Sequence, residues 1–470
     1  MRAGKTPYLL FSVIALAGCG GLGSPSGTPA FQGMPRAAHP LSAASPSPIS
    51  HVVLIIQENR TFNDFFATFP GADGTTVGKV RDDARCRPPI HRGPIKLQKV
   101  GLYLPYDLLH KYSGYHAAYD HGAMDAFDRI NFANGVPECK HPYQYTDPKQ
   151  IQPYWDMASQ YTLAEHMFTT QGSDSFTAHQ DLIAGGVVVR PNEALIDFPS
   201  CSGQLCRWGC DAPAKTFTHL ITNEDVYLAK HGPFPCTNQF ITNPQSYRTL
   251  RDLLDATGIT WKYYVPPIQS NNGRLLSAFD MIAAVRYGPE WTTNVITPQT
   301  QIISDAADGQ LAQMSWVIPS SPDSDHPGAQ NDHGPEWVAA VVNAIGESQY
   351  WDSTAIVVVW DDWGGFYDNL APQQVGFGGL GFRVPCIIIS PYALAGNIST
   401  THYEFGSILK YIEENWNLGT LGTSDARATS ILDSFDYSQN PIPFTPIPSP
   451  LGKEYFLHEE PSTQPPDTDF

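Results

Sequence analysis

The stretch VVLIIQENR, residues 52–60, decides the fold class of this chain. Its five consecutive aliphatic residues predict a short strand that is buried on both faces, as in the middle of a parallel sheet. Glu58 and Asn59 follow almost directly, and a buried carboxylate is costly unless it is paired or binds a metal. The stretch therefore predicts a central strand that ends at a polar site.

A second stretch, TAIVVVWDDWGG at residues 354–365, repeats this arrangement. Its apolar run ends in Asp361 and Asp362, and ligands collect at the carboxyl ends of strands in open parallel sheets. Carboxylate and amide oxygens bind hard divalent cations, and carboxylates also bind zinc. The alternative is that each polar pair caps its strand or binds an arginine such as Arg60 or Arg383. Two such pairs on two buried strands favour a metal site.

The remaining apolar patterns alternate between strand and helix. A helix that leads into a strand is predicted over residues 154–168. Further strands are predicted over 260–265, 314–319 and 384–390, and further helices over 175–185, 246–258 and 335–348. This alternation predicts an α/β fold with a mostly parallel central sheet and helices on both faces.

The N-terminal residues predict export. Residues 1–19 carry Arg2, Lys5, a short apolar run and small residues before Cys19, the pattern of a signal peptide. The ending LAGC resembles a bacterial lipobox, so we expect a lipid on Cys19 that anchors the chain to the membrane of the cell envelope. An ordinary secretory signal is the alternative.

The rest of the chain divides by composition. Residues 20–49 are rich in Gly, Ser and Pro, which predicts a flexible linker. One domain is expected over residues 50–440, followed by a Pro-rich tail over 441–470. The net charge of −18 argues against nucleic acid as a partner, and also against electrostatic binding to anionic lipid.

The cysteines agree with export. Cys386 lies in an apolar run and is expected to be a buried free thiol. The six cysteines in loop-like surroundings predict three disulfides, which allow fifteen pairings: Cys86, Cys139, Cys201, Cys206, Cys210 and Cys236. Three of them lie in CSGQLCRWGC, where zinc is the alternative, but an exported chain favours disulfides. We expect residues 186–245 to form a loop-rich insertion stapled by disulfides.

Several motifs carry a family resemblance. ENRTF, GSDSFTAHQDLIAG, SDHPG, WDDWGGFYDN and GFRVPCIIISPYA follow one another between residues 51 and 418. Together they resemble the bacterial phosphoesterase family of phospholipases C and acid phosphatases, within the alkaline-phosphatase-like superfamily. The resemblance implies hydrolysis of phosphate esters, one divalent metal ion, a phosphorylated Ser or Thr intermediate, and histidines around the phosphoryl group. It leaves open whether the metal is zinc, calcium or magnesium.

The resemblance assigns roles to individual residues. It implies Glu58, Asn59, Asp361, Asp362 and Ser175 as metal ligands. Ser175 is also the expected nucleophile, because a helix N-terminus favours an incoming phosphate and a metal activates a hydroxyl. The alternatives are Ser173 as nucleophile and a simple N-cap role for Ser175.

Two histidines resemble those that contact the phosphoryl group, His110 and His326. The other histidines considered are expected to be structural: His116, His121, His179 and His333. Asn369, in YDNLAP, stands where many relatives have histidine. Because an amide does not titrate near neutrality, we expect reduced turnover from this change.

The substrate stays open at this level. A small-molecule phosphate monoester and a lipid phosphoester both fit the resemblance. A protein of another class, an envelope-anchored binding protein of this fold with weak or lost catalysis, is the alternative.

Overall fold

The computed structural model describes residues 47–200, 209–213, 216–224, 226–232, 236, 247–270, 273, 276–328 and 332–460. The chain divides into two units, Met1–Ala44 and Ser45–Phe470, and every described residue lies in the second. The predicted signal peptide, Cys19 and most of the predicted linker lie outside the described residues. Within the described part, no helix combines the length and the apolar character needed to cross a membrane.

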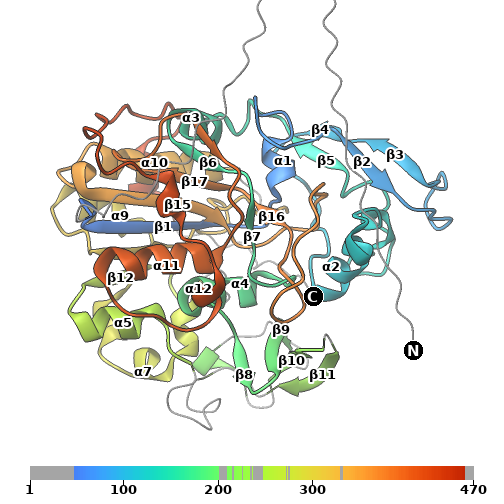
Figure 1. Ribbon diagram of the computed structural model, residues 1–470, viewed down its shortest axis with the longest axis horizontal. Helices are drawn as coiled ribbons and strands as arrows, with labels where there is room; N and C mark the ends of the chain where they lie inside the picture. Colours follow the sequence, from blue (N-terminus) through green and yellow to red (C-terminus); the bar gives the residue numbers. More distant parts are fainter. Residues whose placement is uncertain are drawn as a thin grey trace, which may run out of the picture. The chain divides into compact units, whose positions relative to one another are not determined.

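An eight-stranded sheet forms the centre of the described unit (Figure 1). In spatial order its strands are β13 (Val295–Ile296), β12 (Trp261–Tyr264), β14 (Met314–Val317), β1 (His51–Gln57), β15 (Thr354–Trp360), β17 (Cys386–Ile389), β6 (Thr162–Ala164) and β18 (Asn397–Ser399). The pairs from β13 to β15 and the pair β6–β18 are parallel, whereas β17 runs antiparallel to both of its neighbours. The predicted mostly parallel sheet is confirmed.

The two stretches that open the sequence analysis become adjacent central strands. β1 pairs with β15 in parallel register from His51↔Thr354 to Gln57↔Trp360. Every residue of β15 is buried, as is every residue of β1 after His51. Because the two strands end side by side, the residues that follow them leave the sheet at the same point.

Helices cover both faces of the sheet, as predicted. One group, α3 (Gln152–Gln160), α9 (Gln301–Ala307) and α10 (Gly334–Gly346), packs together through α10. The other group, α4 (Ser175–Ala184), α5 (Leu250–Thr257), α11 (Phe405–Trp416) and α12 (Ser424–Arg427), packs together through α4 and α11. In Figure 1 α3 and α10 lie above β1, and α4, α5 and α11 lie below it.

Shorter elements surround this core. The helices are α1 (Phe62–Phe66), α2 (Tyr112–Tyr119), α7 (Ala283–Arg286), α8 (Glu290–Thr293) and α13 (Lys453–Leu457). A three-stranded sheet holds β16 (Arg383–Val384), β7 (Met167–Phe168) and β19 (Tyr403–Glu404), and two strand pairs hold β2 (Val77–Val80) with β3 (Gly93–Lys96) and β4 (Gln98–Val100) with β5 (Gln144–Thr146).

The predicted insertion over residues 186–245 is more regular than expected. It contains an antiparallel sheet of β8 (Val188–Arg190), β9 (Glu193–Ser200), β10 (Phe217–Thr222) and β11 (Tyr227–Gly232). β9 has a long buried run, but polar residues interrupt the apolar ones in the other strands, and such a pattern predicts loops. The disulfide Cys210–Cys236 staples this region, as predicted.

The structure also tests the predictions of further disulfides, of a buried free thiol and of the alternative zinc cluster. Cys86 and Cys139 form a second disulfide, and Cys386 is a buried free thiol whose pKa is raised by burial. Because Cys210 is bonded to Cys236, it is not available to the alternative zinc cluster. Cys201 and Cys206 lie outside the described residues.

The described part of the predicted tail packs along α10. Phe444 contacts Trp351 with ring centroids 4.9 Å apart, and Phe456 of α13 contacts Trp337 of α10 at 5.4 Å. Ile447 exchanges two hydrogen bonds with the Asn343 side chain. The segment up to residue 460 is therefore part of the packed domain.

Candidate functional site

The ends of β1 and β15 place the predicted acidic and amide residues together. The Asn59 backbone N–H donates to Asp361 Oδ1 at 2.9 Å, and the Asp362 N–H donates to the same oxygen at 2.7 Å. Glu58, Asn59, Asp361 and Asp362 are all at most 2% exposed. The strand register thus creates a compact, buried acidic cluster from two segments that are far apart in the sequence.

Tight backbone turns hold this cluster. Asn59 has a positive φ of 58°, a conformation that Asn tolerates better than most residues. Gly364 follows the acidic pair with φ 57°, and a Cβ there would lie 2.1 Å from the Asn59 carbonyl oxygen. The Gly364 N–H donates to Asp362 Oδ1 at 2.8 Å, which fixes that carboxylate. The glycine after the acidic pair is therefore required by the close approach of the two strand ends.

Helix α4 brings a hydroxyl and an imidazole to the same place. Ser175 is its first residue, and Ser175 Oγ donates to Asp362 Oδ2 at 3.0 Å and lies 3.5 Å from Asn59 Oδ1. His179 follows one turn later on the same helix face. Its Nε2 lies 3.2 Å from Glu58 Oε1 and 3.6 Å from Asp361 Oδ2. The helix therefore presents Ser175 to one carboxylate and His179 to two others.

Ser173 has a different role from Ser175. Ser173 Oγ accepts a hydrogen bond from the Asp197 backbone N–H at 2.9 Å, and Asp174 Oδ2 accepts one from the Phe198 N–H at 2.8 Å. Both bonds attach the loop before α4 to β9. They engage Ser173 in the scaffold, whereas the Ser175 hydroxyl faces the acidic cluster.

Ligand atoms of Glu58, His179 and Asp361 lie within 4.8 Å of one another, close enough to share one metal ion. Asp361 Oδ2, which lies 3.6 Å from His179 Nε2, is buried and accepts no hydrogen bond from a donor within the described part of the chain. One nitrogen and two carboxylate oxygens are a donor set that zinc accepts. The residues present therefore fit the divalent cation that the resemblance implies.

Electrostatics favour a cation at this point. Burial, reinforced by the Glu58 carboxylate, raises the pKa of Asp361 to about 7. Burial also raises the pKa of Asp362 to about 7, where His110 opposes the rise and Asp361 adds to it. Burial lowers the pKa of His179, which favours the neutral imidazole that binds metals. A bound divalent cation would stabilise the ionised carboxylates.

His110 contacts the cluster through Asn59. His110 Nδ1 lies 2.7 Å from the Leu108 carbonyl oxygen, so Nδ1 is the protonated nitrogen. Nε2 then accepts from Asn59 Nδ2 at 2.8 Å and lies 3.9 Å from Asp362 Oδ2. The structure thus brings His110 to the predicted site.

Glu138 supports the loop that carries His110. It is fully buried, and its Oε1 accepts from the Leu109 backbone N–H at 2.8 Å. Its Oε2 makes no hydrogen bond to the described residues. Burial raises the pKa of Glu138 to about 8, so the side chain is a neutral acid at pH 7.

His326 lies next to His110. The centroids of the two rings are 6.1 Å apart in an edge-to-face arrangement, and His326 Nδ1 lies 2.6 Å from the Pro327 carbonyl oxygen. His326 is half-buried, whereas His110 is fully buried. The two predicted histidines therefore occupy one side of the acidic cluster.

Asn369 makes a different contact. Its Oδ1 accepts from Arg383 Nη2 at 2.8 Å, and Arg383 also binds Asp368 through two further hydrogen bonds. These described contacts join Asn369 to a buried arginine rather than to Ser175. The reduced turnover expected from Asn369 stays a prediction.

Sequence reasoning missed one residue of this cluster. His179 was expected to be structural, but it lies against Glu58 and Asp361. Its position four residues after Ser175 on a predicted helix is the sequence feature that indicates a shared face. Of the other histidines set aside, His116 and His121 are exposed, and His333 lies elsewhere in the fold.

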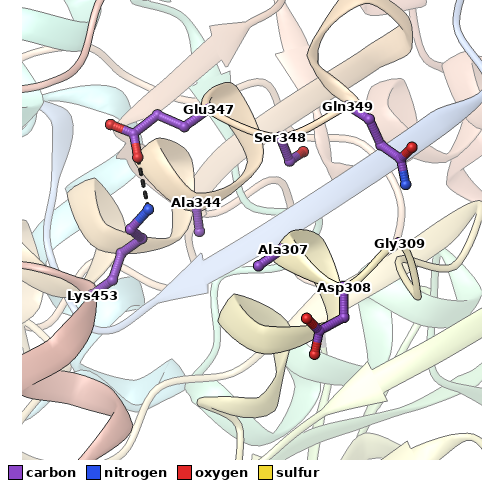
Figure 2. A pocket seen from close by; sticks show the side chains of 8 residues that line it. All are labelled: Ala307, Asp308, Gly309, Ala344, Glu347, Ser348, Gln349 and Lys453. Carbon is purple, nitrogen blue, oxygen red and sulfur yellow. Dashed lines mark hydrogen bonds and ion pairs between the residues drawn. The ribbon is translucent and has the colours of Figure 1, made fainter.

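A surface pocket of about 450 Å³ lies apart from this cluster (Figure 2). Its lining includes Asp308, Glu347 and Lys453, and none of the predicted site residues. Lys453 Nζ and Glu347 Oε2 form an ion pair of 2.7 Å across it. Ser175 is therefore not among the residues that line this pocket.

Comparison with known proteins agrees with the geometry. The model of the phosphoesterase family matches residues 49–419. Phospholipase C A of Mycobacterium tuberculosis is 24% identical over 422 residues, which cover 79% of this chain and 73% of that protein. Non-hemolytic phospholipase C of Pseudomonas aeruginosa is 24% identical over 447 residues, which cover 85% of this chain and 59% of that protein.

Among solved structures, a protein of the alkaline phosphatase superfamily from Vibrio parahaemolyticus aligns with a TM-score of 0.36 and 11% identity. The alignment covers 83% of this chain and 73% of that one.

Proposed function

Because the chain belongs to the phosphoesterase family, we propose that it hydrolyses phosphoric esters with Ser175 as the nucleophile and one divalent metal ion as cofactor. The observation that carries the proposal is the position of Ser175 Oγ, which lies 3.0 Å from Asp362 Oδ2 at the N-terminus of α4. The same helix places His179 against Glu58 and Asp361. A nucleophile, an acceptor for its proton and a candidate metal site thus meet in one buried cluster.

The candidate metal ligands are Glu58, His179 and Asp361, with Asn59, Asp362 and the Ser175 hydroxyl beside them. When bound, a divalent cation there would lower the pKa of the serine hydroxyl and neutralise charge on the phosphoryl oxygens. The donor set of nitrogen and oxygen favours zinc, but calcium and magnesium remain alternatives.

In the first step, Ser175 Oγ attacks phosphorus. Its proton passes to Asp362 Oδ2, which already accepts a hydrogen bond from the Ser175 hydroxyl at 3.0 Å. The Oγ–P bond forms as the bond from phosphorus to the leaving alkoxide breaks. The backbone N–H groups at the start of α4 favour the phosphoryl oxygens at this point.

The two histidines would serve the leaving group and the second step. His110 Nε2 accepts from Asn59 Nδ2, and His326 lies next to the His110 ring; whichever of these two imidazoles has taken up a second proton would donate it to the departing alkoxide. A water molecule then attacks the phosphorus of the phosphoserine and gives one proton to the imidazole that protonated the alkoxide. The Oγ–P bond breaks, Asp362 returns its proton to Ser175 Oγ, and the product leaves as a phosphomonoester from a diester substrate or as phosphate from a monoester. Asn59 links His110 to the Ser175 region by hydrogen bonding.

For the substrate, we propose a lipid phosphodiester, because both relatives described above are phospholipases C. A phosphate monoester is the alternative. p-Nitrophenyl phosphorylcholine and p-nitrophenyl phosphate report on the two classes. Faster turnover of the diester supports the lipid substrate, and turnover of the monoester alone contradicts it.

The nucleophile is tested by rapid acid quench during turnover of a slow phosphoester. We expect phosphate on the peptide that contains residues 171–185, and no label in Ser175→Ala. Turnover in Ser175→Ala should fall by at least about 1,000-fold, because nucleophile and activating groups act as one unit. Ser173→Ala is the matched control and should keep the label and the chemistry. A label on Ser173, or near-normal turnover in Ser175→Ala, would show the assignment to be wrong.

A protein that binds phosphoesters without turnover is not favoured by a specific contact in the structure. The sequence feature that suggests such a protein is Asn369, and the Asn369 side chain is hydrogen-bonded to Arg383. The proposed cellular location is the envelope, through export and a lipid on Cys19.

A further inference from the structure

A second group of metal-binding side chains lies outside the proposed active site. It consists of Asp323 in the loop after β14, His333 at the N-terminus of α10, and Glu459 after α13. One ligand atom from each lies within 4.8 Å of the others. The three residues come from three separate segments, which packing brings together at one end of α10.

The His333 imidazole lies close to both other members of this group. His333 Nδ1 lies 4.0 Å from Asp323 Oδ1 and 4.0 Å from Glu459 Oε1. Tetrahedral zinc with bonds of about 2.1 Å holds its ligand atoms about 3.4 Å apart. The two distances from His333 Nδ1 therefore need to shorten by only about 0.6 Å to match such an ion.

An independent observation is the state of Asp323. This residue is fully buried, and its Oδ2 accepts from Ser320 Oγ at 2.5 Å. Its Oδ1 lies 4.0 Å from His333 Nδ1 and receives no hydrogen bond from an N–H or hydroxyl donor in the described ranges, while the Asp323 and Glu459 carboxyls share a hydrogen bond through one proton. Two buried carboxyls that must keep a proton between them are costly to ionise, and a cation at this point would take the place of that proton.

The surroundings also favour a cation. Burial, followed by the Glu459 carboxylate, raises the pKa of Asp323 well above its usual range. Burial lowers the pKa of His333, so the imidazole is neutral and available as a ligand. The Tyr455 hydroxyl lies 3.4 Å from His333 Nδ1 and also hydrogen-bonds to the Glu459 side chain.

We propose that Asp323, His333 and Glu459 form a second metal site, which takes a zinc-class divalent cation through one nitrogen and two carboxylate oxygens. Calcium and magnesium prefer all-oxygen sites, so the imidazole selects a transition metal. The site is structural in character, because none of its three residues belongs to the proposed active site and each comes from a different segment of the scaffold.

Such an ion would fasten the last described segment to the domain. The segment runs along α10 from the Lys453–Glu347 ion pair (Figure 2), through the contact of Phe456 with Trp337, to Glu459. The ion would hold the far end of this segment. It would also fix the loop of Asp323, whose backbone carbonyl accepts from Gln57 Nε2 at 3.1 Å.

The test is zinc stoichiometry of the full-length protein. The protein is stripped with a chelator, dialysed against buffered Zn²⁺ and measured by elemental analysis. We expect two equivalents in the wild type and one in His333→Gln or Glu459→Gln. Glu454→Gln is the matched control, because Glu454 is an exposed carboxylate on α13 outside the group. It should retain two equivalents.

A double variant separates this site from the active site. Adding Glu58→Gln to His333→Gln should remove the remaining equivalent. Removing His333 should lower the Zn²⁺ affinity of this site by more than about 100-fold, since losing a residue that only hydrogen-bonds to a metal ligand already lowers affinity by about 10–100-fold. Zinc should also raise the unfolding temperature of the wild type more than that of His333→Gln.

Three results would overturn the proposal. The first is a wild type that binds a single equivalent, which Glu58→Gln removes. That outcome would leave Asp323 and Glu459 as a pair that shares a proton, and would leave the proposed function intact. The second is two equivalents in His333→Gln, and the third is an equal loss in Glu454→Gln. Failure of Ser175 labelling would not affect the zinc count at this site.

Discussion

Glu138→Gln is expected to stabilise the protein at alkaline pH and to leave its stability nearly unchanged at acid pH. Glu138 is fully buried beneath the His110 loop, and only its Oε1 has a described hydrogen bond, from the Leu109 N–H. Glutamine retains an oxygen for that bond and has nearly the same shape. The substitution therefore removes the ability to ionise while it preserves the packing.

The magnitude follows from the pKa of Glu138, which burial raises from 4.5 to about 8 in the folded state. Because the folded-state pKa is above the unfolded one, the stabilising contribution is fully present below about pH 4.5. It is then lost as the pH rises to about 8. At about 1.4 kcal/mol for each pH unit between the two values, the loss is about 5 kcal/mol.

The assay is urea unfolding of wild type and Glu138→Gln between pH 5 and pH 8.5. The difference in the free energy of unfolding should be below about 1 kcal/mol at pH 5 and should reach several kcal/mol at pH 8.5, in favour of the variant. Glu224→Gln is the control, since Glu224 is exposed, and its difference should not change with pH. A constant difference between wild type and Glu138→Gln would refute the argument that Glu138 is buried as a neutral acid.

Three further predictions concern the scaffold and the anchor. Replacing Cys86 and Cys139 by alanine removes a disulfide between residues that are 53 positions apart in the sequence, which should lower the free energy of unfolding by about 4 kcal/mol. Denaturation without reductant measures this, and an unchanged midpoint would contradict it. Arg383→Met leaves the Asp368 carboxylate buried without the guanidinium that lies 2.9 Å away, and should lower the free energy of unfolding by about 3–5 kcal/mol. Adding Asp368→Asn should restore part of that loss. A double variant as unstable as Arg383→Met would count against a charge effect. Cys19→Ser should move the protein from the membrane fraction to the soluble fraction, and unchanged fractionation would exclude a lipid anchor.

The sequence was most informative where a single physical pattern dominated. The apolar runs of β1 and β15 are long, continuous and end in acidic residues, so burial and the position of the polar cluster both followed from them. Helix α10 was equally clear, with Pro335 in its first turn and an almost entirely buried apolar sequence. These patterns determined the centre of the sheet and the helices on its faces.

The insertion was harder to predict. The strands β8, β10 and β11 mix polar and apolar residues, and their pairing depends on β9 and on the Cys210–Cys236 disulfide. Local sequence does not encode such partners. The antiparallel direction of β17 was also missed, because an apolar run such as CIII has no direction of its own.

Within the candidate site, the strand-end residues were predictable and the histidines only in part. Glu58 and Asp361 follow their strands directly, so parallel pairing brings them together. His179 reaches them because the tertiary fold brings α4 to the ends of these two strands. Its four-residue spacing from Ser175 gave the helix face but not the direction in which that face points.

The pairing of β1 with β15 also has a consequence for how the chain folds. Asn59 and Asp361 bond to each other across 302 residues, and the first strand of the domain completes its hydrogen bonding only against one near the other end. Contacts of such high sequence separation form slowly, because a long loop must close before they stabilise anything. During synthesis, a ribosome that has not passed residue 361 holds a chain whose acidic cluster does not yet exist. Such a nascent chain lacks the candidate metal ligand Asp361 and the Asp362 partner of Ser175, so the proposed site would be completed only after the strand near the other end of the domain has been made.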